Sequence, residues 1–317
     1  MPKQPDDVAS EISNRLELAM LFEVSAYPKP GNVHRTRDYP DTRFEHFLAS
    51  AVACRSSFEK AAEKGSLISK RKLRPQDARV GEIIRDAAVN TISSQRGGNT
   101  SLGTVTLLVP LAVAAGMTFT KNLLPLQGLR RNLHRILAST TVTDTIDFYE
   151  AVSCVKPGGL GRVPQLDLED PTSKKEILRL EVGLLDVFRL AADRDSICSE
   201  WTTDYSITFE LGYPFFKREL LKTDDINAAT VNTYLKILSE KHDTLVARKA
   251  GIRKARWVSN RVRKALALGG VRSLAGRREI ERLDNELGRN GNVLNPGATA
   301  DLTASIVALA TLSGYRP

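Results

Sequence analysis

The residues of this 317-residue chain that could do chemistry lie mostly in breaks between predicted helices, where glycine and proline interrupt the helical pattern. Glycine leaves backbone N–H groups accessible, and the first amides of a helix beside such a break are unpaired and lie at the positive end of its dipole. An anion such as phosphate is favoured there. Five such breaks, rich in Asn, Asp and Arg, therefore predict one convergent polar site. They occupy residues 28–41, 97–103, 156–162, 242–251 and 295–302.

The first break combines positive charge with carboxylates. Two prolines stiffen the sequence P-K-P-G-N-V-H-R, and Gly31 lets another group approach closely. Lys29, His34 and Arg35 supply positive charge, while Asp41 supplies a carboxylate that could bind magnesium or act as a base. A solvated loop with ordinary charges is the alternative interpretation.

The second and third breaks are rich in glycine. Gly98, Asn99 and Thr100 lie in G-G-N-T-S-L-G, which could wrap a phosphate or a ribose. No G-K-[ST] follows, so the segment is not a P-loop. The same glycines and Asn could equally be helix caps. Gly159 lies in the third break, K-P-G-G-L-G-R, where glycines again have basic neighbours.

The fourth break places charge at the start of a helix. Asp243 could be a plain N-cap, which accepts hydrogen bonds from the first helical amides. Arg248 and Lys249 follow about one turn later and could face a polyphosphate.

The fifth break, Asn295-Pro296-Gly297, ends one element, and Asp301 falls in the first turn of the helix expected next. That carboxylate could simply compensate the helix dipole. It could instead lie beside a phosphate-binding turn, where a magnesium ligand would be useful.

Helices must position these breaks, because apolar residues such as Ile12, Leu16, Ala19 and Phe22 recur at helical spacing and no run of alternating strands is present. The pattern predicts an all-α fold. We expect one domain over residues 1–317, with a subdivision near residue 170 as the alternative. The expected helices cover about residues 8–26, 44–64, 77–94, 101–116, 122–138, 143–154, 173–198, 226–240, 244–268, 274–288 and 299–312.

Bulk properties narrow the class of protein. The net charge of +9 favours anionic partners. Three distant cysteines, Cys54, Cys154 and Cys198, argue against a disulfide framework and a thiolate zinc site. The N-terminal residues lack the apolar core of a signal peptide, and the longest apolar stretch, residues 105–117, is too short to span a bilayer. A cytoplasmic protein without a membrane partner is expected, and its oligomeric state stays open.

In their order and spacing, these motifs resemble the triphosphoribosyl-dephospho-CoA synthase family, over about residues 10–312. No single motif is decisive, but together they are fairly specific. They are P-K-P-G-N-V-H-R at 28–35 with Asp41, F-x-x-F-L-x-S at 44–50, G-G-N-T-S-L-G at 97–103, P-G-G-L-G at 157–161, R-D-S-I at 194–197, H-D-T-L-V-A-R-K-A-G at 242–251 and N-P-G-A-T-A-D-L-T at 295–303.

The resemblance implies an all-α transferase that joins ATP to 3′-dephospho-CoA. The 2′-hydroxyl of the acceptor attacks C1′ of the ATP ribose, adenine leaves, and magnesium accompanies the triphosphate. The product is the precursor of an acyl-carrier prosthetic group. Breaking an N-glycosidic bond builds positive charge on the ribose, which a carboxylate stabilises, and a carboxylate or His can deprotonate the hydroxyl.

On that basis we expect Asp41, Asp301 and His34 to be catalytic, and the two aspartates also to bind the metal. His34 could equally be a loop histidine without a catalytic role. The expected substrate-binding residues are Lys29, Gly31, Asn32, Arg35, Gly98, Asn99, Thr100, Gly159, Arg248, Lys249, Asn295 and Gly297.

The sequence also departs from the family pattern. An S-G-A-H element expected before Asp41 has no clear match, and G-G-N-T-S-L-G replaces G-x-N-T-H-K-G. A divergent branch of archaeal or one-carbon-metabolising bacterial type is indicated, so a different acceptor, for example in tetrahydromethanopterin synthesis, is the first alternative. A helical nucleic-acid-binding protein is the second, because residues 248–278 hold eleven Arg or Lys and no Asp or Glu, although only Trp257 could stack on a base.

Overall fold

The structure is a computed structural model that describes residues 5–119, 124–161, 163, 165–289 and 291–317, and all regular elements in these ranges are helices. The prediction of an all-α fold is confirmed. The α-helices are α1 (Pro5–Ser25), α2 (Phe44–Ser69), α3 (Val80–Ser94), α4 (Leu102–Thr118), α5 (Leu126–Ala138), α6 (Val142–Val155), α7 (Ser173–Leu180), α8 (Leu184–Ala191), α9 (Ser196–Thr202), α10 (Tyr213–Thr223), α11 (Ile226–Glu240), α12 (Thr244–Ala250), α13 (Ile252–Ala267), α14 (Leu274–Gly288) and α15 (Gly297–Leu312). Short turns of 3₁₀-helix at Pro75–Ala78, Gly270–Arg272 and Gly291–Leu294 and of π-helix at Ile207–Gly212 complete the regular structure.

Two expected helices are divided in the structure, so their prediction as continuous elements is wrong. The segment 173–198 forms α7, α8 and part of α9, because Glu181 adopts a left-handed φ of 53° and Asp195 begins a new helix as its N-cap. The segment 244–268 forms α12 and α13, which Gly251 separates with φ +85°. A left-handed residue ends a helix because its amide turns away from the helical hydrogen-bond ladder.

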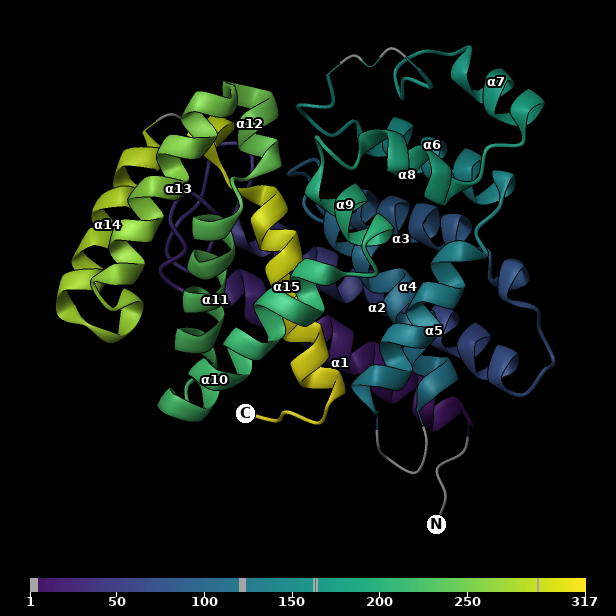
Figure 1. Cartoon of the computed structure of the whole chain (residues 1–317), viewed down its shortest axis with the longest axis horizontal. Coiled ribbons are helices and arrows are strands. Elements are labelled where there is room, and N and C mark those ends of the chain that lie inside the picture. The colour runs from purple at the N-terminus through teal and green to yellow at the C-terminus, as the bar shows by residue number, and fades with distance from the viewer. Residues whose placement is uncertain (1–4, 120–123, 162, 164, 290) are drawn as a thin grey trace.

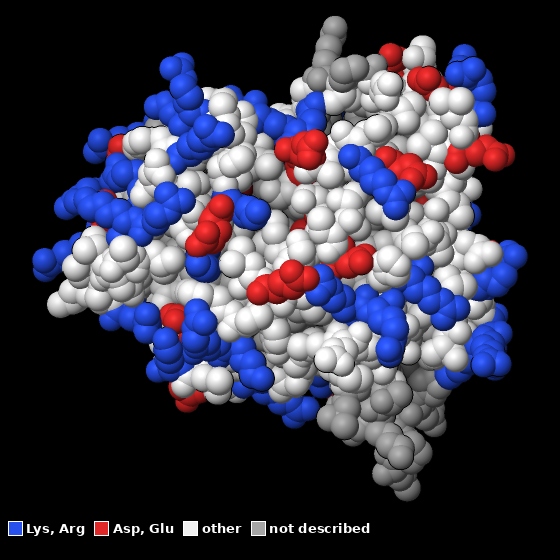
Figure 2. Space-filling view, viewed as in Figure 1, with Lys and Arg blue, Asp and Glu red and all other residues white. Residues whose placement is uncertain are grey.

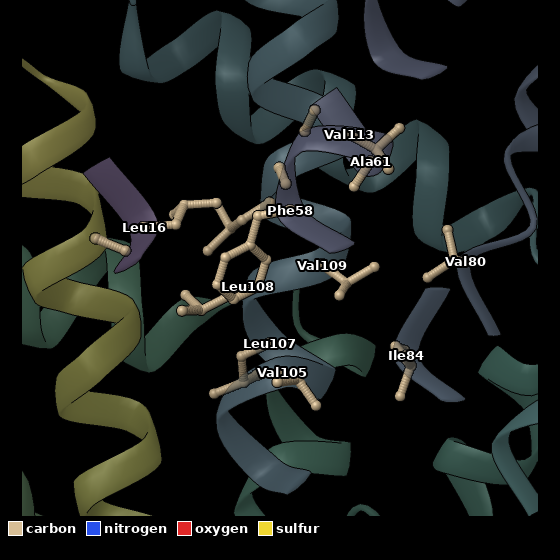
Figure 3. Packing of buried hydrophobic residues seen from close by; sticks show 14 of the residues in the cluster. Leu16, Phe58, Ala61, Val80, Ile84, Val105, Leu107, Leu108, Val109 and Val113 are labelled. Carbon is tan, nitrogen blue, oxygen red and sulfur yellow. The ribbon is translucent and has the colours of Figure 1, made fainter. Parts of the chain in front are cut away.

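The centre of the molecule is built by α1, α2, α4 and α15, which pack against one another (Figure 1). Figure 3 shows Leu16 of α1, Phe58 of α2 and Leu108 of α4 converging in this core, and all three are fully buried. The segment 101–116 forms the helix expected there, α4, which is apolar on every face and buried along nearly its whole length.

The helices α2 and α4 approach so closely that only glycine fits between them at two positions. A Cβ atom added at Gly65 would lie 2.0 Å from the carbonyl oxygen of Val113. One added at Gly116 would lie 2.0 Å from the carbonyl oxygen of Ala62. Both contacts are far below van der Waals separation, so the crossing of these helices depends on the two glycines.

The remaining helices cover this centre from two sides. Helices α11 to α14 pack on one side around a second apolar cluster that includes Tyr234, Val258 and Leu283, while α3, α5 and α6 pack on the other (Figure 1). Helix α15 lies between the two groups and contacts α1, α4 and α11. The breaks between helices are thereby brought in from both ends of the chain.

In the described part of the chain, no helix is both long and apolar enough to cross a membrane. The single domain over residues 1–317 stays a prediction, as does its alternative, a subdivision near residue 170.

A buried carboxyl group on α9 predicts a pH-dependent stability. Glu200 accepts hydrogen bonds from the amides of Ile207 and Thr208 (2.8 and 2.9 Å), and burial raises its pKa to about 7. The folded state therefore holds a proton that the unfolded state has already lost, so stability falls as pH rises from about 4.5 to about 7 and then levels off. A shift of this size corresponds to a loss on the order of 3 kcal/mol.

The variant Glu200→Gln cannot ionise, so we expect a flatter dependence of the unfolding free energy on pH, measured by urea denaturation at pH 5 and pH 8. Other titrating groups contribute equally to both proteins and cancel in the comparison. Parallel pH curves for wild type and variant would contradict the assignment.

Candidate active site

A cavity of about 1140 Å³ lies where the breaks between helices meet. Its wall draws on the segments that join α1 to α2, α3 to α4 and α6 to α7, on the start of α12, and on the start of α15. The convergence of the five breaks, expected from their composition, is therefore present in the structure. Predicted site residues in the wall are Asn32, Asp41, Gly98, Asn99, Thr100, Arg248, Lys249, Asn295, Gly297 and Asp301.

Asp301 is a buried carboxyl group in this wall whose pKa is strongly raised. It accepts a 2.5 Å hydrogen bond from the hydroxyl of Thr104 on α4. Removal from water raises its pKa to about 8, a shift that the Thr104 hydrogen bond opposes and the charge of Glu23 reinforces. Near neutral pH this group consequently holds its proton, and a cation brought close to it would favour ionisation.

The position of Asp301 in its helix differs from the expectation. Helix α15 begins at Gly297 rather than at residue 299, which places Asp301 in the second turn. The prediction that it lies in the first turn is wrong, and compensation of the helix dipole, which acts within the first turn, therefore explains this residue poorly.

The first break lies against the cavity through Asn32, whose side chain joins two breaks. Its amide nitrogen donates to the side-chain oxygen of Asn295 (2.8 Å), and its oxygen accepts from Nζ of Lys29 (3.0 Å). Lys29 is fully buried and forms an ion pair with Glu23. Burial lowers the pKa of Lys29 and raises that of Glu23, while each charge opposes the shift of the other. This network fixes Asn32 and Asn295 as a pair of amides facing the cavity.

The glycine-rich second break is held by its own polar side chains. Asn99 accepts a hydrogen bond from the amide of Leu102 (3.1 Å) at the start of α4, and the hydroxyls of Thr100 and Ser50 lie 2.7 Å apart. Gly98 has φ +68°, and a Cβ added there would meet nothing within 4 Å. Asn99 thus satisfies the first amide of α4 from outside the helix, whose N-cap is Ser101, so the alternative in which Asn99 is itself the N-cap is wrong.

The basic pair on α12 faces the third break. Arg248 donates from Nε to the carbonyl oxygen of Gly159 (2.7 Å) and from Nη1 to Asp195 (2.7 Å). Nζ of Lys249 lies 3.4 Å from the carbonyl oxygen of Asn292, and burial lowers the pKa of this lysine while the charges of Asp243 and Asp41 raise it. Lys249 is the basic side chain of this pair without a carboxylate bonded to it.

Four predicted residues of the first break lie outside the cavity wall. His34 is 1% exposed, with Nε2 3.4 Å from Asp284 of α14, and burial lowers its pKa. The amide of Gly31 donates to the same carboxylate (2.9 Å). Arg35 donates to the carbonyl oxygen of Ser25 and to Asn227, and Lys29 is occupied by Glu23. Gly159 likewise lies behind the wall, as an acceptor for Arg248.

These residues therefore support the cavity wall from behind and do not line the cavity. The sequence did not predict these positions because the first break is buried against α11 and α14, which are distant in sequence.

Most basic side chains of residues 248–278 form ion pairs or hydrogen bonds within the protein. Figure 2 shows Lys and Arg gathered over α12, α13 and α14, where Arg261 pairs with Glu286 and Lys264 lies near Glu279.

Three carboxylates of the site were not among the predicted residues: Glu23 and Asp195 line the cavity, and Asp243 supports it from behind. Glu23 lines the cavity from the last turn of α1. A single charged residue in an amphipathic helix does not indicate a functional role, so the sequence did not identify it. Asp243 is confirmed as the N-cap of α12, and its other oxygen accepts from the amide and hydroxyl of Thr299 (2.7 and 2.8 Å). It therefore ties the start of α12 to the start of α15, which positions Asp301 and Lys249 on one wall.

Comparison with known proteins bears on what this cavity holds. The family model for ATP:dephospho-CoA triphosphoribosyl transferase matches residues 9–317. A protein of Azotobacter vinelandii named probable 2-(5''-triphosphoribosyl)-3'-dephosphocoenzyme-A synthase is 26% identical, with 90% of this chain and 86% of that protein covered. A protein of the same name from Citrobacter koseri is 25% identical, with 93% and 88% covered.

The fold has a counterpart among solved structures. The crystal structure of a candidate triphosphoribosyl-dephospho-CoA synthase from Archaeoglobus fulgidus superposes with a TM-score of 0.62 at 24% identity. The match covers 85% of this chain and 100% of that one. At this identity the likeness bears on the fold.

Proposed function

The chain belongs to the ATP:dephospho-CoA triphosphoribosyl transferase family, and from this membership we propose that its cavity joins the triphosphoribosyl group of ATP to 3′-dephospho-CoA. The observation that carries the proposal is the meeting of a perturbed carboxyl group, Asp301, with amides and basic side chains from five distant segments. ATP is supplied in the cytoplasm, where we accordingly place the protein.

The reaction exchanges one bond at C1′ of the ATP ribose. The 2′-hydroxyl oxygen of the acceptor forms a bond to C1′, and the C1′–N9 bond breaks with its electron pair leaving on adenine. The hydroxyl proton passes to a base, and adenine takes up a proton. Ionised Asp301 would stabilise positive charge on the ribose or receive the hydroxyl proton. Lys249 and Arg248 would bind triphosphate oxygens, and Asn32 and Asn295 would hydrogen-bond ribose or phosphate.

We also propose magnesium as a companion of the triphosphate. Within the described ranges no group of three or more His, Cys, Asp and Glu side chains could hold a metal ion. Magnesium in nucleotide sites commonly takes one or two carboxylates and completes its shell with phosphate oxygens and water. Asp301 and Asp41 both line the cavity and fit such a partial site. When bound, the ion would neutralise phosphate charge.

The test is to incubate the purified protein with ATP, magnesium and 3′-dephospho-CoA, and to measure free adenine and product mass by liquid chromatography and mass spectrometry. Adenine release with a triphosphoribosyl adduct supports the proposal. ATP binding without adenine release would favour another acceptor, the alternative suggested by the departures in the first and second breaks. Absence of both would overturn the nucleotide site and direct attention to the basic helices.

A glycine on α4 gives a sharper prediction. A Cβ atom added at Gly103 would lie 2.1 Å from Oδ2 of Asp301, so that carboxylate must move. Alanine favours a helix over glycine by about 1 kcal/mol, so the fold should persist. We expect Gly103→Ala to lower the rate of adenine release at least roughly tenfold, since about 1.4 kcal/mol of lost transition-state stabilisation is tenfold in rate.

The matched control is Gly128→Ala on α5, where an added Cβ meets only side chains, those of Thr118 at 3.2 Å and Pro125 at 3.5 Å. Its melting temperature and adenine release should stay near wild type. An unchanged rate in Gly103→Ala would mean that the position of the Asp301 carboxylate does not matter.

A further inference from the structure

The cavity has two walls of different chemistry. One carries the charged and amide side chains already described, such as Lys249, and also the basic side chains of Arg43 and Arg96. The other is supplied by α6, α8 and residues 163 and 165–168 of the loop between α6 and α7, whose lining side chains carry no charge, whereas Lys156, where that loop begins, is charged. The uncharged lining residues are Phe148, Tyr149, Val152, Val163, Gln165, Leu166, Leu168, Val187, Phe188, Leu190 and Ala191.

This uncharged wall is rigidly built rather than loosely collapsed. The rings of Phe148 and Phe188 meet edge to face with centroids 4.9 Å apart, and Phe188 meets Trp201 in the same way at 4.7 Å. The hydroxyl of Tyr149 donates to the carbonyl oxygen of Leu166 (2.5 Å), which holds the loop on α6. The wall is therefore preformed, as apolar ligand sites usually are.

The far end of the wall reaches solvent. Leu190 lines the cavity on α8 and is nevertheless 55% exposed, while Phe188 beside it is 2% exposed. The nearest basic side chain of α8, Arg189, is paired with Asp186 (2.5 Å). An elongated uncharged group could thus lie along this wall from the polar half of the cavity to the surface.

Resting on the proposed function, we propose that this wall binds the pantetheine arm of 3′-dephospho-CoA. Both substrates carry an adenosine and phosphates, which the basic wall suits. Only the acceptor carries a long, uncharged chain of methylenes, amides and a gem-dimethyl group. The volume of about 1140 Å³ exceeds the roughly 300–1,000 Å³ of ordinary ligand sites, which accords with two substrates held together. The arm extends past Leu168 and leaves the protein beside Leu190.

The test uses Leu190→Asp at the exposed rim and Leu168→Ser on the half-buried loop, where Leu168 packs against the edge of the main core. The control is Leu221→Asp on α10, which is 79% exposed and lies outside the cavity wall. Isothermal titration measures the affinities for 3′-dephospho-CoA and for ADP, which lacks the arm. Melting temperatures verify folding.

We expect both variants to weaken binding of 3′-dephospho-CoA roughly tenfold, the size of losing one or two buried methylene contacts, with ADP affinity unchanged. The control should match wild type for both ligands. In turnover, KM for the acceptor should rise while KM for ATP and kcat stay near wild type.

Two results would overturn this assignment: equal weakening of ADP and 3′-dephospho-CoA, or no weakening of either. A rise in KM for ATP alone would place the adenine of ATP on this wall instead. Because titration requires no turnover, a wild type that binds 3′-dephospho-CoA without releasing adenine would defeat the proposed reaction and leave the arm site standing.

Discussion

Replacing Asp301 with Asn should reduce the rate of adenine release at least about 100-fold, the scale of losing a charge-stabilising or acid–base group. The amide keeps the shape of the carboxyl group and can still accept the 2.5 Å hydrogen bond from Thr104. It cannot carry the negative charge that the reaction needs. The measurement is single-turnover adenine release with saturating ATP and 3′-dephospho-CoA.

The pKa of Asp301, raised to about 8, also predicts the direction in which activity changes with pH. In wild type, kcat/KM should rise as pH increases toward 8, since it reports the ionisation of the free enzyme. Stability should change in the opposite sense, because the folded state retains a proton that the unfolded state loses near pH 4. Asp301→Asn removes this destabilisation, so at pH 8 the variant should melt no lower than wild type. Activity within about threefold of wild type would exclude Asp301 from catalysis.

Gly116→Ala should lower the free energy of unfolding by more than about 3 kcal/mol, beyond the usual range for added methyl groups in a core. The new Cβ would lie 2.0 Å from the carbonyl oxygen and 2.9 Å from the carbonyl carbon of Ala62, both backbone atoms of α2. A side chain could rotate away, but two packed helices must separate. The gain in helix propensity of about 1 kcal/mol does not offset this.

Urea denaturation of Gly116→Ala, with Gly128→Ala as its helical control, measures the effect. The same outcome is expected for Gly65→Ala, whose Cβ meets the carbonyl oxygen of Val113 at 2.0 Å. A loss below about 1 kcal/mol would show that α2 and α4 can separate without disturbing the core around Phe58 and Leu108.

The sequence predicted the fold class and the loops that build the site, because both depend on local signals. Hydrophobic spacing and cap residues located most helices to within a few residues. Asp243 was identifiable as an N-cap from its own type and position. Helix α10 was missed, although Pro214 beside its first residue is the kind of start signal that could have located it.

The distribution of roles within the first break could not be predicted. Lys29 and Arg35 are of the residue types that bind phosphate. Lys29, however, forms an ion pair with Glu23, and Arg35 donates a hydrogen bond to Asn227, 192 residues away. His34 could act as a base by its residue type, yet its ring contacts the carboxylate of Asp284, 250 residues away. Partners as distant as Asn227 and Asp284 leave no local trace, whereas Glu23 lies only six residues from Lys29. Only the packing of α1, α11 and α14 decides which side chains face the cavity.

The position of α15 has a consequence for how the protein is made. This helix is buried on nearly every face and fills the space between α1, α4 and α11. During synthesis at about 5–20 residues per second, α1 and its neighbours would wait roughly 15–55 seconds for it to emerge. Throughout that time their apolar surfaces would be open to water and to other chains. Protection of the nascent chain, rather than its final stability, should therefore limit the yield of active enzyme when elongation is slow, when many chains are made at once, or when the cell is hot.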